Sequence, residues 1–243
     1  MRGHSSLAAR GHGFTLLELL ITLAIVATLV ALMMPALSKV RETADRMTCA
    51  SNQYQIGAAL GLYAKDHRDQ LPPSYFGSPS VNMPQEMMTV TTGVLAAVPN
   101  NWEGLGILTQ QAQCYLGDHR CLYCPSHRGT HSMESEVGAG ALMLTASRIY
   151  MNYHYRGDYD LTEQRHRRID QPHDYIFLTD GLRTQEDFNH GNGGNRLHGD
   201  LGVSWWTDGA TFPVMEQLPA GELSPPAQAA FYQSIWQQIV VAE

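Results

Sequence analysis

Residues 14–34 read FTLLELLITLAIVATLVALMM, and Glu18 is the one charged side chain among them. A helix of this length would be about 30 Å long, which matches the hydrocarbon core of a bilayer. The apolar run is longer than the roughly 7–15 residues of an ordinary secretory signal. An ordinary cleavage site is nevertheless available after Ala36-Leu37-Ser38, so a membrane anchor and a discarded signal are both open at this point.

The helical pattern continues past the apolar run. Between Leu37 and Tyr63, apolar side chains recur every three or four residues, with polar residues on the opposite face. Pro35 should bend this helix because it removes one backbone donor, and Leu71-Pro72-Pro73 should end it. No Gly/Ser-rich linker separates the two parts, so one continuous helix from about residue 14 to residue 67 is favoured over an anchor followed by a separate helix.

Composition limits the classes of function. The chain has 243 residues, enough for one or two domains, and a formal net charge of -7. A nucleic-acid-binding protein needs a basic face to neutralise phosphates, so we expect no nucleic-acid partner. If the body is exported, the four cysteines can form disulfides in any of three connectivities; they are Cys49, Cys114, Cys121 and Cys124.

The charge inside the apolar run needs an explanation. A carboxylate in a membrane helix costs a few kcal/mol near the centre of the bilayer and less toward its edge. Residues 1–13 form a short basic leader with no acidic residue, and cleavage after Gly13 would create an α-amine at Phe14. That amine would lie within reach of Glu18 in a neighbouring subunit. The alternative is a glutamate that is simply tolerated near the membrane interface.

These residues resemble a known signal. Gly13 followed by Phe14, with Glu18 at the fifth mature position and an unbroken apolar run behind it, is similar to the prepilin-type signal of type IV pilins and type II secretion pseudopilins. Pro35 also falls where many pilins carry a helix-bending proline. The resemblance implies cleavage by a prepilin peptidase, N-methylation of Phe14 and assembly with other pilin or pseudopilin subunits, with Glu18 neutralising a neighbour's amine.

The resemblance also implies where the chain resides. Basic residues flank the apolar run on both sides, so charge alone does not orient it; they are Arg2 and Arg10 before it and Lys39, Arg41 and Arg46 after it. Pilins are single-pass proteins of the bacterial inner membrane, with a cytoplasmic N-terminus and an external body, before they enter a pilus or pseudopilus. We expect the same of this chain.

The body resembles a second, more specific family. Its start reads Cys49-x-x-Asn52-x-x-Gln55-Ile56-Gly57, followed later by Cys124-Pro125-Ser126 and by His198, nine residues, then Asp208-Gly209. This order is similar to the pseudopilin-like family abundant in planctomycetes, whose C-terminal motif is His-x9-Asp-Gly. The chain departs from that family in having Ala210 where a second His often follows, and in carrying an extra C-terminal tail. The resemblance therefore implies the architecture of the body but little about its function.

The expected fold class is α+β and pilin-like. A long N-terminal helix should pack on an antiparallel sheet of three or four strands, followed by a C-terminal helix. Apolar runs predict strands over residues 149–155, 175–179 and 202–207, and helices over residues 105–113 and 227–241, while residues 74–101 read mostly as loop. The expected organisation is a leader over residues 1–13, a transmembrane half-helix over 14–34, an exposed half-helix over 35–70 and a globular domain over 71–243.

The cysteines allow two kinds of site. Cys114, Cys121, Cys124 and His127 have the right number and type of ligands for tetrahedral zinc, but in irregular spacing. An exported body favours disulfides instead, with Cys49 to Cys124 and Cys114 to Cys121 as the expected pairs and other connectivities open. In the chain-entropy model, a bridge from residue 49 to residue 124 would stabilise the fold by about 4 kcal/mol.

Other chemistry is less well supported. Asp180, Asp200 and Asp208 lie near Gly-rich loops and are weak calcium candidates, as some secretion pseudopilins bind calcium near this end; turn and cap roles are favoured. No nucleophile-elbow or protease signature surrounds a Cys or Ser that could act with His198, so we expect no enzyme. A structural subunit is favoured, and its elaborate body suggests a minor one. A membrane-anchored cell-surface binding domain is the alternative, followed by a small envelope metalloprotein or hydrolase.

Overall fold

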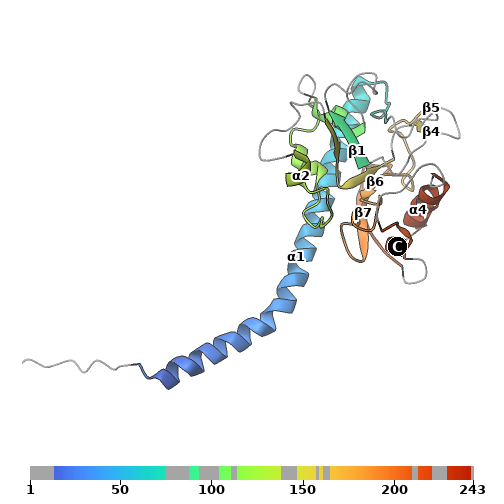
Figure 1. The fold of residues 1–243 in the computed structure, drawn as a ribbon. Coiled ribbons are helices and arrows are strands. Elements are labelled where there is room, and N and C mark those ends of the chain that lie inside the picture. Colours follow the sequence, from blue (N-terminus) through green and yellow to red (C-terminus); the bar gives the residue numbers. More distant parts are fainter. Residues whose placement is uncertain are drawn as a thin grey trace, which may run out of the picture. The chain divides into compact units, whose positions relative to one another are not determined.

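The computed structural model describes residues 14–74, 88–92, 104–110, 114–137, 147–156, 159–160, 165–209, 213–220 and 229–241 (Figure 1). It divides into two compact units, residues 1–41 and residues 42–243. Helix α1, Leu16–Asp66, contributes to both units and contains Pro35. The expected long helix is therefore confirmed.

Local contacts explain where α1 ends. Beyond Asp66, the backbone of Arg68 and Asp69 is left-handed, with φ of 57° and 62°. The Asp69 N–H donates to the carbonyl of Ala64, at 2.8 Å, which closes the last helical turn. The helix thus stops before Pro72 and Pro73, which cannot continue it.

A four-stranded antiparallel sheet lies at the centre of residues 42–243, in the order β3-β6-β7-β8. Its strands are β3 (Tyr153–Tyr155), β6 (Ile176–Asp180), β7 (Gly193–His198) and β8 (Val203–Thr207). The smaller pairs are β1 (Thr89–Thr92) with β2 (Ser147–Tyr150) and β4 (Tyr159–Asp160) with β5 (Arg165–His166). The short helices are η2 (Gly104–Thr109), η3 (His119–Leu122), α2 (Met133–Val137) and α3 (Val214–Gln217).

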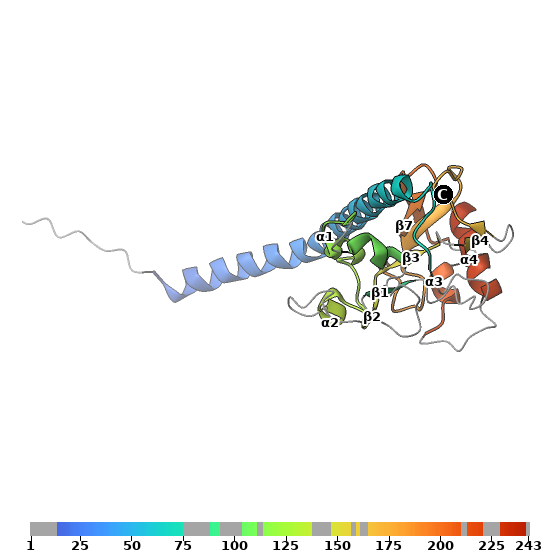
Figure 2. The same cartoon turned by 90° about the horizontal axis from the view of Figure 1, so that it is seen from above.

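Two helices cover opposite faces of this sheet (Figures 1 and 2). On β7, Leu197 points to α1, since a Cβ added at Gly57 would lie 2.9 Å from its Cδ1. The preceding residue, Arg196, points the other way and donates to the carbonyl of Ile239 in α4, Ala229–Val241. Successive side chains of a strand alternate between faces, so the sheet lies between α1 and α4.

A separate apolar cluster forms on each face. The cluster on the α1 side includes Ile56, Leu60 and Tyr153, and the cluster on the α4 side includes Trp206 and Tyr232. The expected packing of a small antiparallel sheet on the long helix, with a C-terminal helix, is confirmed.

Four expectations for the body are wrong in detail. The single strand expected over residues 149–155 is two strands, β2 and β3, which belong to different sheets. The chain passes from one sheet to the other at Met151 and Asn152, whose N–H groups donate to the carbonyls of Met88 and Leu122. Strand β1 lies within the region expected as loop. The helix over residues 105–113 is a 3-10 helix that ends at Thr109. Strand β7, the partner of both β6 and β8, was not expected.

Candidate functional site

The first part of α1 presents a continuous apolar surface. Its most apolar 18-residue window has a mean hydropathy of 2.6, and none of that window is buried by the rest of the chain. Among the described residues, α1 is the one helix long and apolar enough to cross a membrane. Phe14 is 76% exposed and Leu16 is 87% exposed. A surface of this kind requires lipid or other apolar helices to cover it.

Glu18 closes a capping box with Thr15 at the start of α1. The Thr15 N–H and hydroxyl both donate to Glu18 Oε2, each at 2.9 Å, and the Glu18 N–H donates to Thr15 Oγ1 at 3.2 Å. This reciprocal pair satisfies backbone donors that a helix N-terminus leaves open. The sequence signal for this capping box is the Thr-x-x-Glu spacing of Thr15 and Glu18. Of the two expected processing residues, Phe14 is the first described residue and Gly13 lies outside the described residues.

The structure joins one of the two expected cysteine pairs. Cys49, on the buried face of α1, forms a disulfide with Cys124. Cys114 and Cys121 are free thiols, so their expected bridge is wrong. Their sulfurs have other partners, because Cys114 donates to the carbonyl of Leu116 at 3.2 Å and Cys121 to Gln55 Oε1 at 3.3 Å.

The zinc set raised from the sequence does not come together either. Cys124 is bonded to Cys49, and His127 Nδ1 lies 2.9 Å from Asn189 Oδ1. Among the described residues, the one group of metal-ligand type is different: it contains Cys49, Cys124, Asp180 and His190.

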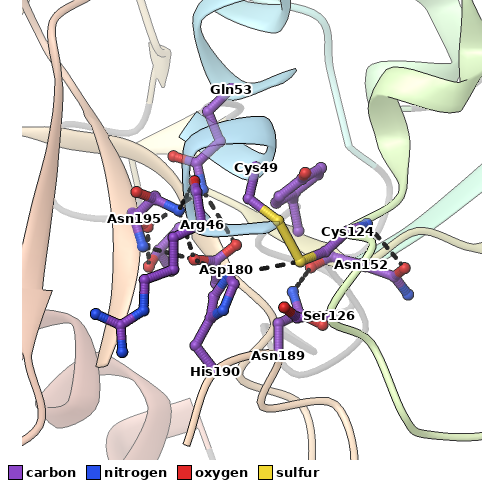
Figure 3. Close-up of polar contacts among 12 residues, drawn as sticks. Arg46, Cys49, Gln53, Cys124, Ser126, Asn152, Asp180, Asn189, His190 and Asn195 are labelled. Carbon is purple, nitrogen blue, oxygen red and sulfur yellow. Dashed lines mark hydrogen bonds and ion pairs between the residues drawn. A yellow bond between two sulfur atoms is a disulfide. The ribbon is translucent and has the colours of Figure 1, made fainter. Parts of the chain in front are cut away.

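These four residues belong to what we call the buried polar cluster. It consists of the disulfide with Gln53, Asp180, His190 and Asn195 (Figure 3), and the partly exposed Glu42 lies at its edge. Asp180, at the end of β6, accepts from the Asn195 N–H at 2.5 Å and from Gln53 Nε2 at 3.5 Å. Gln53 Nε2 also donates to the Asn195 carbonyl, at 3.2 Å. The cluster thus joins α1 to strands β6 and β7.

His190 is the centre of the cluster. Its side chain is fully buried, and its Nδ1 lies 2.7 Å from Glu42 Oε1. Its Nε2 lies 3.5 Å from Cys124 Sγ and 3.7 Å from Asp180 Oδ2. Because an ionised carboxylate only accepts hydrogen bonds, Nδ1 donates to Glu42, and Nε2 is directed toward the sulfur and the Asp180 carboxyl group.

The two carboxyl groups of the cluster are perturbed in opposite directions. Burial alone would raise the pKa of Glu42, but hydrogen bonds from His190, Arg46 and Ser126 outweigh it and hold that pKa below its ordinary value. Complete burial dominates at Asp180 and raises its pKa, although His190 and Asn195 act against this rise. In the cluster, the ionised form of Glu42 is therefore stabilised, whereas burial disfavours the ionised form of Asp180.

The predicted C-terminal motif does not form a joint site. His198 Nδ1 lies 2.9 Å from the carbonyl of His173, and its Nε2 lies 2.7 Å from Ser204 Oγ. Asp208 instead accepts from the backbone N–H groups of Val214, at 2.6 Å, and Met215, at 3.1 Å, and so caps α3. Gly209 is exposed.

The three weak calcium candidates also lie in separate environments. Asp180 is in the buried cluster and Asp208 caps α3, whereas Asp200 accepts from the Gly202 N–H and pairs with His173. His190 was not predicted as a site residue from the sequence. The motif spacing does not single it out, because nine residues separate His190 from Asp200 just as nine residues separate His198 from Asp208. Only the fold brings it to the cysteines.

Two protein-family models match the chain. A model described as "Prokaryotic N-terminal methylation motif" matches residues 9–34, and one described as "Protein of unknown function (DUF1559)" matches residues 38–215, most of the chain. The chain belongs to the DUF1559 family. The DUF1559 match begins within α1, at residue 38, and contains the disulfide and the buried polar cluster, whereas α4 lies beyond it.

Both resemblances read from the sequence are thereby confirmed. The methylation motif makes this DUF1559 member a pilin-like protein, and the family itself is the pseudopilin-like one. No curated protein and no solved structure is detectably similar to the chain. The family description assigns no task, so the function rests on the chain's own residues.

Proposed function

We propose that this DUF1559 member is a structural subunit, a minor pilin or pseudopilin, of a type IV pilus or type II secretion pseudopilus. The observation that carries the proposal is the unburied apolar part of α1, which lies within the match to the methylation motif. In this proposal a prepilin peptidase removes residues 1–13 at the inner membrane, the body lies outside, and the role is mechanical rather than catalytic.

Assembly would cover the apolar surface that the subunit leaves open. Apolar helices gain little from leaving lipid for one another, so packing and polar pairs must favour their association. Glu18 supplies such a polar group, since a carboxylate in the membrane is costly until it meets a cation. The new α-amine at Phe14 of a neighbour is the cation that the proposal assigns to it.

The body is bound firmly to the part of α1 within residues 42–243. Ile56 and Leu60 of α1 have no exposed surface, and Cys49 is bonded to Cys124. The helix is therefore a wall of the core, and a force on α1 would act directly on the body. This arrangement suits a subunit that must withstand transport or tension.

The capping box suggests a sharp test of Glu18. Gln can replace Glu in a capping box, so Glu18→Gln keeps the helix start but removes the charge, whereas Glu18→Ala removes both. We expect both variants to insert into the membrane and both to be absent from the sheared filament fraction. Normal incorporation of Glu18→Gln would mean that Glu18 acts only as a cap.

Cross-linking distinguishes the proposal from a solitary anchored domain. Two copies of the chain are co-expressed, one with a cysteine in place of Leu19 and one with a cysteine in place of Leu23, because pairing of Glu18 with a neighbour's Phe14 staggers the helices by four residues. Both positions lie on the exposed apolar surface, and Cys114 and Cys121 are Ser in both copies. A filament subunit predicts disulfide-linked dimers between neighbouring helices. A membrane-anchored binding domain predicts monomers only, and that result would contradict the proposal.

A further inference from the structure

The disulfide lies inside a set of four potential metal ligands. One ligand atom from each of Cys49, Cys124, Asp180 and His190 lies within 4.8 Å of all the others. All four residues are buried, with at most 5% of their surface exposed. They come from α1, the segment after η3, the end of β6 and the residues before β7, so the fold rather than the local sequence assembles them.

The two distances from His190 Nε2 fit a tetrahedral zinc shell. Zinc binds sulfur at about 2.3 Å and imidazole nitrogen at about 2.0–2.1 Å, which places a sulfur and a nitrogen on one ion about 3.6 Å apart and a nitrogen and an oxygen about 3.4 Å apart. His190 Nε2 lies 3.5 Å from Cys124 Sγ and 3.7 Å from Asp180 Oδ2. Two thiolates on one zinc lie about 3.8 Å apart, so the sulfurs must separate when their bond is reduced.

The groups around the ligands suit a metal as well. Metal-binding histidines usually donate their other ring N–H to a carboxylate, which fixes the tautomer, and His190 Nδ1 has Glu42 at 2.7 Å. Ligating carboxylates are themselves usually hydrogen-bonded, and Asp180 accepts from the Asn195 N–H. A divalent ion would also offset the cost of the completely buried Asp180 carboxylate.

We propose that the reduced chain binds one zinc ion at this cluster, through the sulfurs of Cys49 and Cys124, Nε2 of His190 and a carboxylate oxygen of Asp180. The disulfide then replaces the metal on oxidation. Both forms join Cys49 of α1 to Cys124, so the body is cross-linked to the helix in either redox state. An open groove lined by Asn52, Cys121 and Cys124 gives access to the Cys124 side of the cluster.

The zinc-bound and disulfide forms interconvert by a two-electron exchange. A newly made chain carries both cysteines as thiols, and zinc binding releases their protons. From the oxidised form, a dithiol reductant supplies two electrons, the S–S bond breaks, each sulfur becomes a thiolate, and the reductant leaves as its own disulfide. A disulfide-forming oxidant reverses this step, because it removes two electrons, joins the sulfurs and releases the metal.

Cobalt(II) provides the test, since its visible spectrum reports tetrahedral thiolate ligation. The full-length chain in detergent, with Cys114→Ser and Cys121→Ser so that Cys49 and Cys124 are its only thiols, is reduced, freed of reductant under anaerobic conditions and titrated. We expect one cobalt per chain, displaced by one equivalent of zinc, and none in the oxidised chain. A reduced chain that binds no metal would overturn the proposal.

Variants identify the ligands. His190→Ala and Asp180→Asn should each weaken metal binding at least tenfold, about the loss that even outer-shell changes produce. His127→Ala is the matched control, because His127 is also buried near Cys124 but lies outside the set. Unchanged binding in both ligand variants, or loss only in His127→Ala, would contradict the assignment.

X-ray absorption of the zinc-loaded, reduced wild-type chain gives an answer even if a variant fails to fold. We expect two sulfur and two nitrogen or oxygen ligands, whereas three sulfurs or none would overturn the ligand set. These measurements do not involve the apolar part of α1, so their outcome is independent of the filament proposal.

Discussion

The Nδ1–H of His190 donates to Oε1 of Glu42, at 2.7 Å, and so links the residues before β7 to α1 across 148 positions of sequence. Glu42 also accepts from Arg46 Nε at 3.3 Å and from Ser126 Oγ at 3.2 Å. One carboxylate thus binds two segments of the body, those of Ser126 and His190, to the helix, while Arg46 lies on the helix itself. The stability of the body should depend on its ionisation.

The first prediction concerns pH. The pKa of Glu42 is lower in the folded chain than its ordinary value of 4.5, so its contribution to stability is complete above about pH 4.5 and is lost as the pH falls through the folded pKa. Glu42→Gln should therefore be less stable than wild type at pH 7, and the difference in denaturant midpoint should shrink below pH 4.5.

The exposed Glu134 gives the control, because Glu134→Gln should follow the wild-type curve. A difference between Glu42→Gln and wild type that stays constant from pH 7 to pH 3 would show that the carboxylate charge is not what stabilises this contact.

The second prediction concerns the disulfide. Cys49 and Cys124 are 75 residues apart, and opening that loop should lower the free energy of unfolding by about 4 kcal/mol in the chain-entropy model. The double variant Cys49→Ser/Cys124→Ser should show this loss in denaturant unfolding. Reductant with a metal chelator should produce a similar loss in wild type and none in the double variant.

Cys114→Ser is the matched control, since Cys114 is an exposed free thiol. It should leave the free energy of unfolding within about 0.5 kcal/mol of wild type. If reductant with chelator left the wild-type chain as stable as before, the Cys49–Cys124 bond would carry no stabilising role.

The third prediction concerns the contact of α1 with β7. A Cβ at Gly57 would meet Leu197 Cδ1 at 2.9 Å, whereas a Cβ at Gly61, one turn later, would meet Leu201 Cδ1 at 3.5 Å. Overpacking of a full core costs about 1–3 kcal/mol, so Gly57→Val should lower the free energy of unfolding by this amount. Gly61→Val should change it by less than about 0.5 kcal/mol, because the gain in helix propensity is small. Equal effects at both positions would contradict the proposed close packing.

The sequence predicted the elements whose signal is continuous. The apolar run from Phe14 and the three-and-four spacing through Tyr63 predicted α1 almost to its last residue. Compact apolar runs also predicted β6 and β8. In each of these elements, the apolar side chains that pack in the core are also the ones that form the apolar pattern along the sequence.

Strand β7 could not be predicted in that way. It begins Gly193-Gly194, which is unlike a strand, but the glycines are required by the close approach of β8. Gly193 has φ of 149°, and a Cβ there would lie 2.1 Å from the Trp206 carbonyl oxygen. Tertiary crowding, rather than local propensity, selected these residues.

For a similar reason, only part of the buried polar cluster could be predicted from the sequence. Cysteines are few, so Cys49 and Cys124 were identifiable as partners, but His190 is one of eleven histidines and Asp180 was interpreted as a turn residue. Their roles follow from β6 and β7 running side by side. The residue pattern of one strand does not show which other strand of the chain pairs with it.

The N-terminus of the mature chain tests the central claim most directly. Mass spectrometry of the protein purified from membranes should find a chain that begins at N-methylated Phe14 and lacks residues 1–13, as processing at the methylation motif over residues 9–34 requires. A chain that begins near Lys39 would indicate an ordinary secretory signal. That result, or an unprocessed chain that retains Met1, would contradict the account of this protein as a pilin-like subunit.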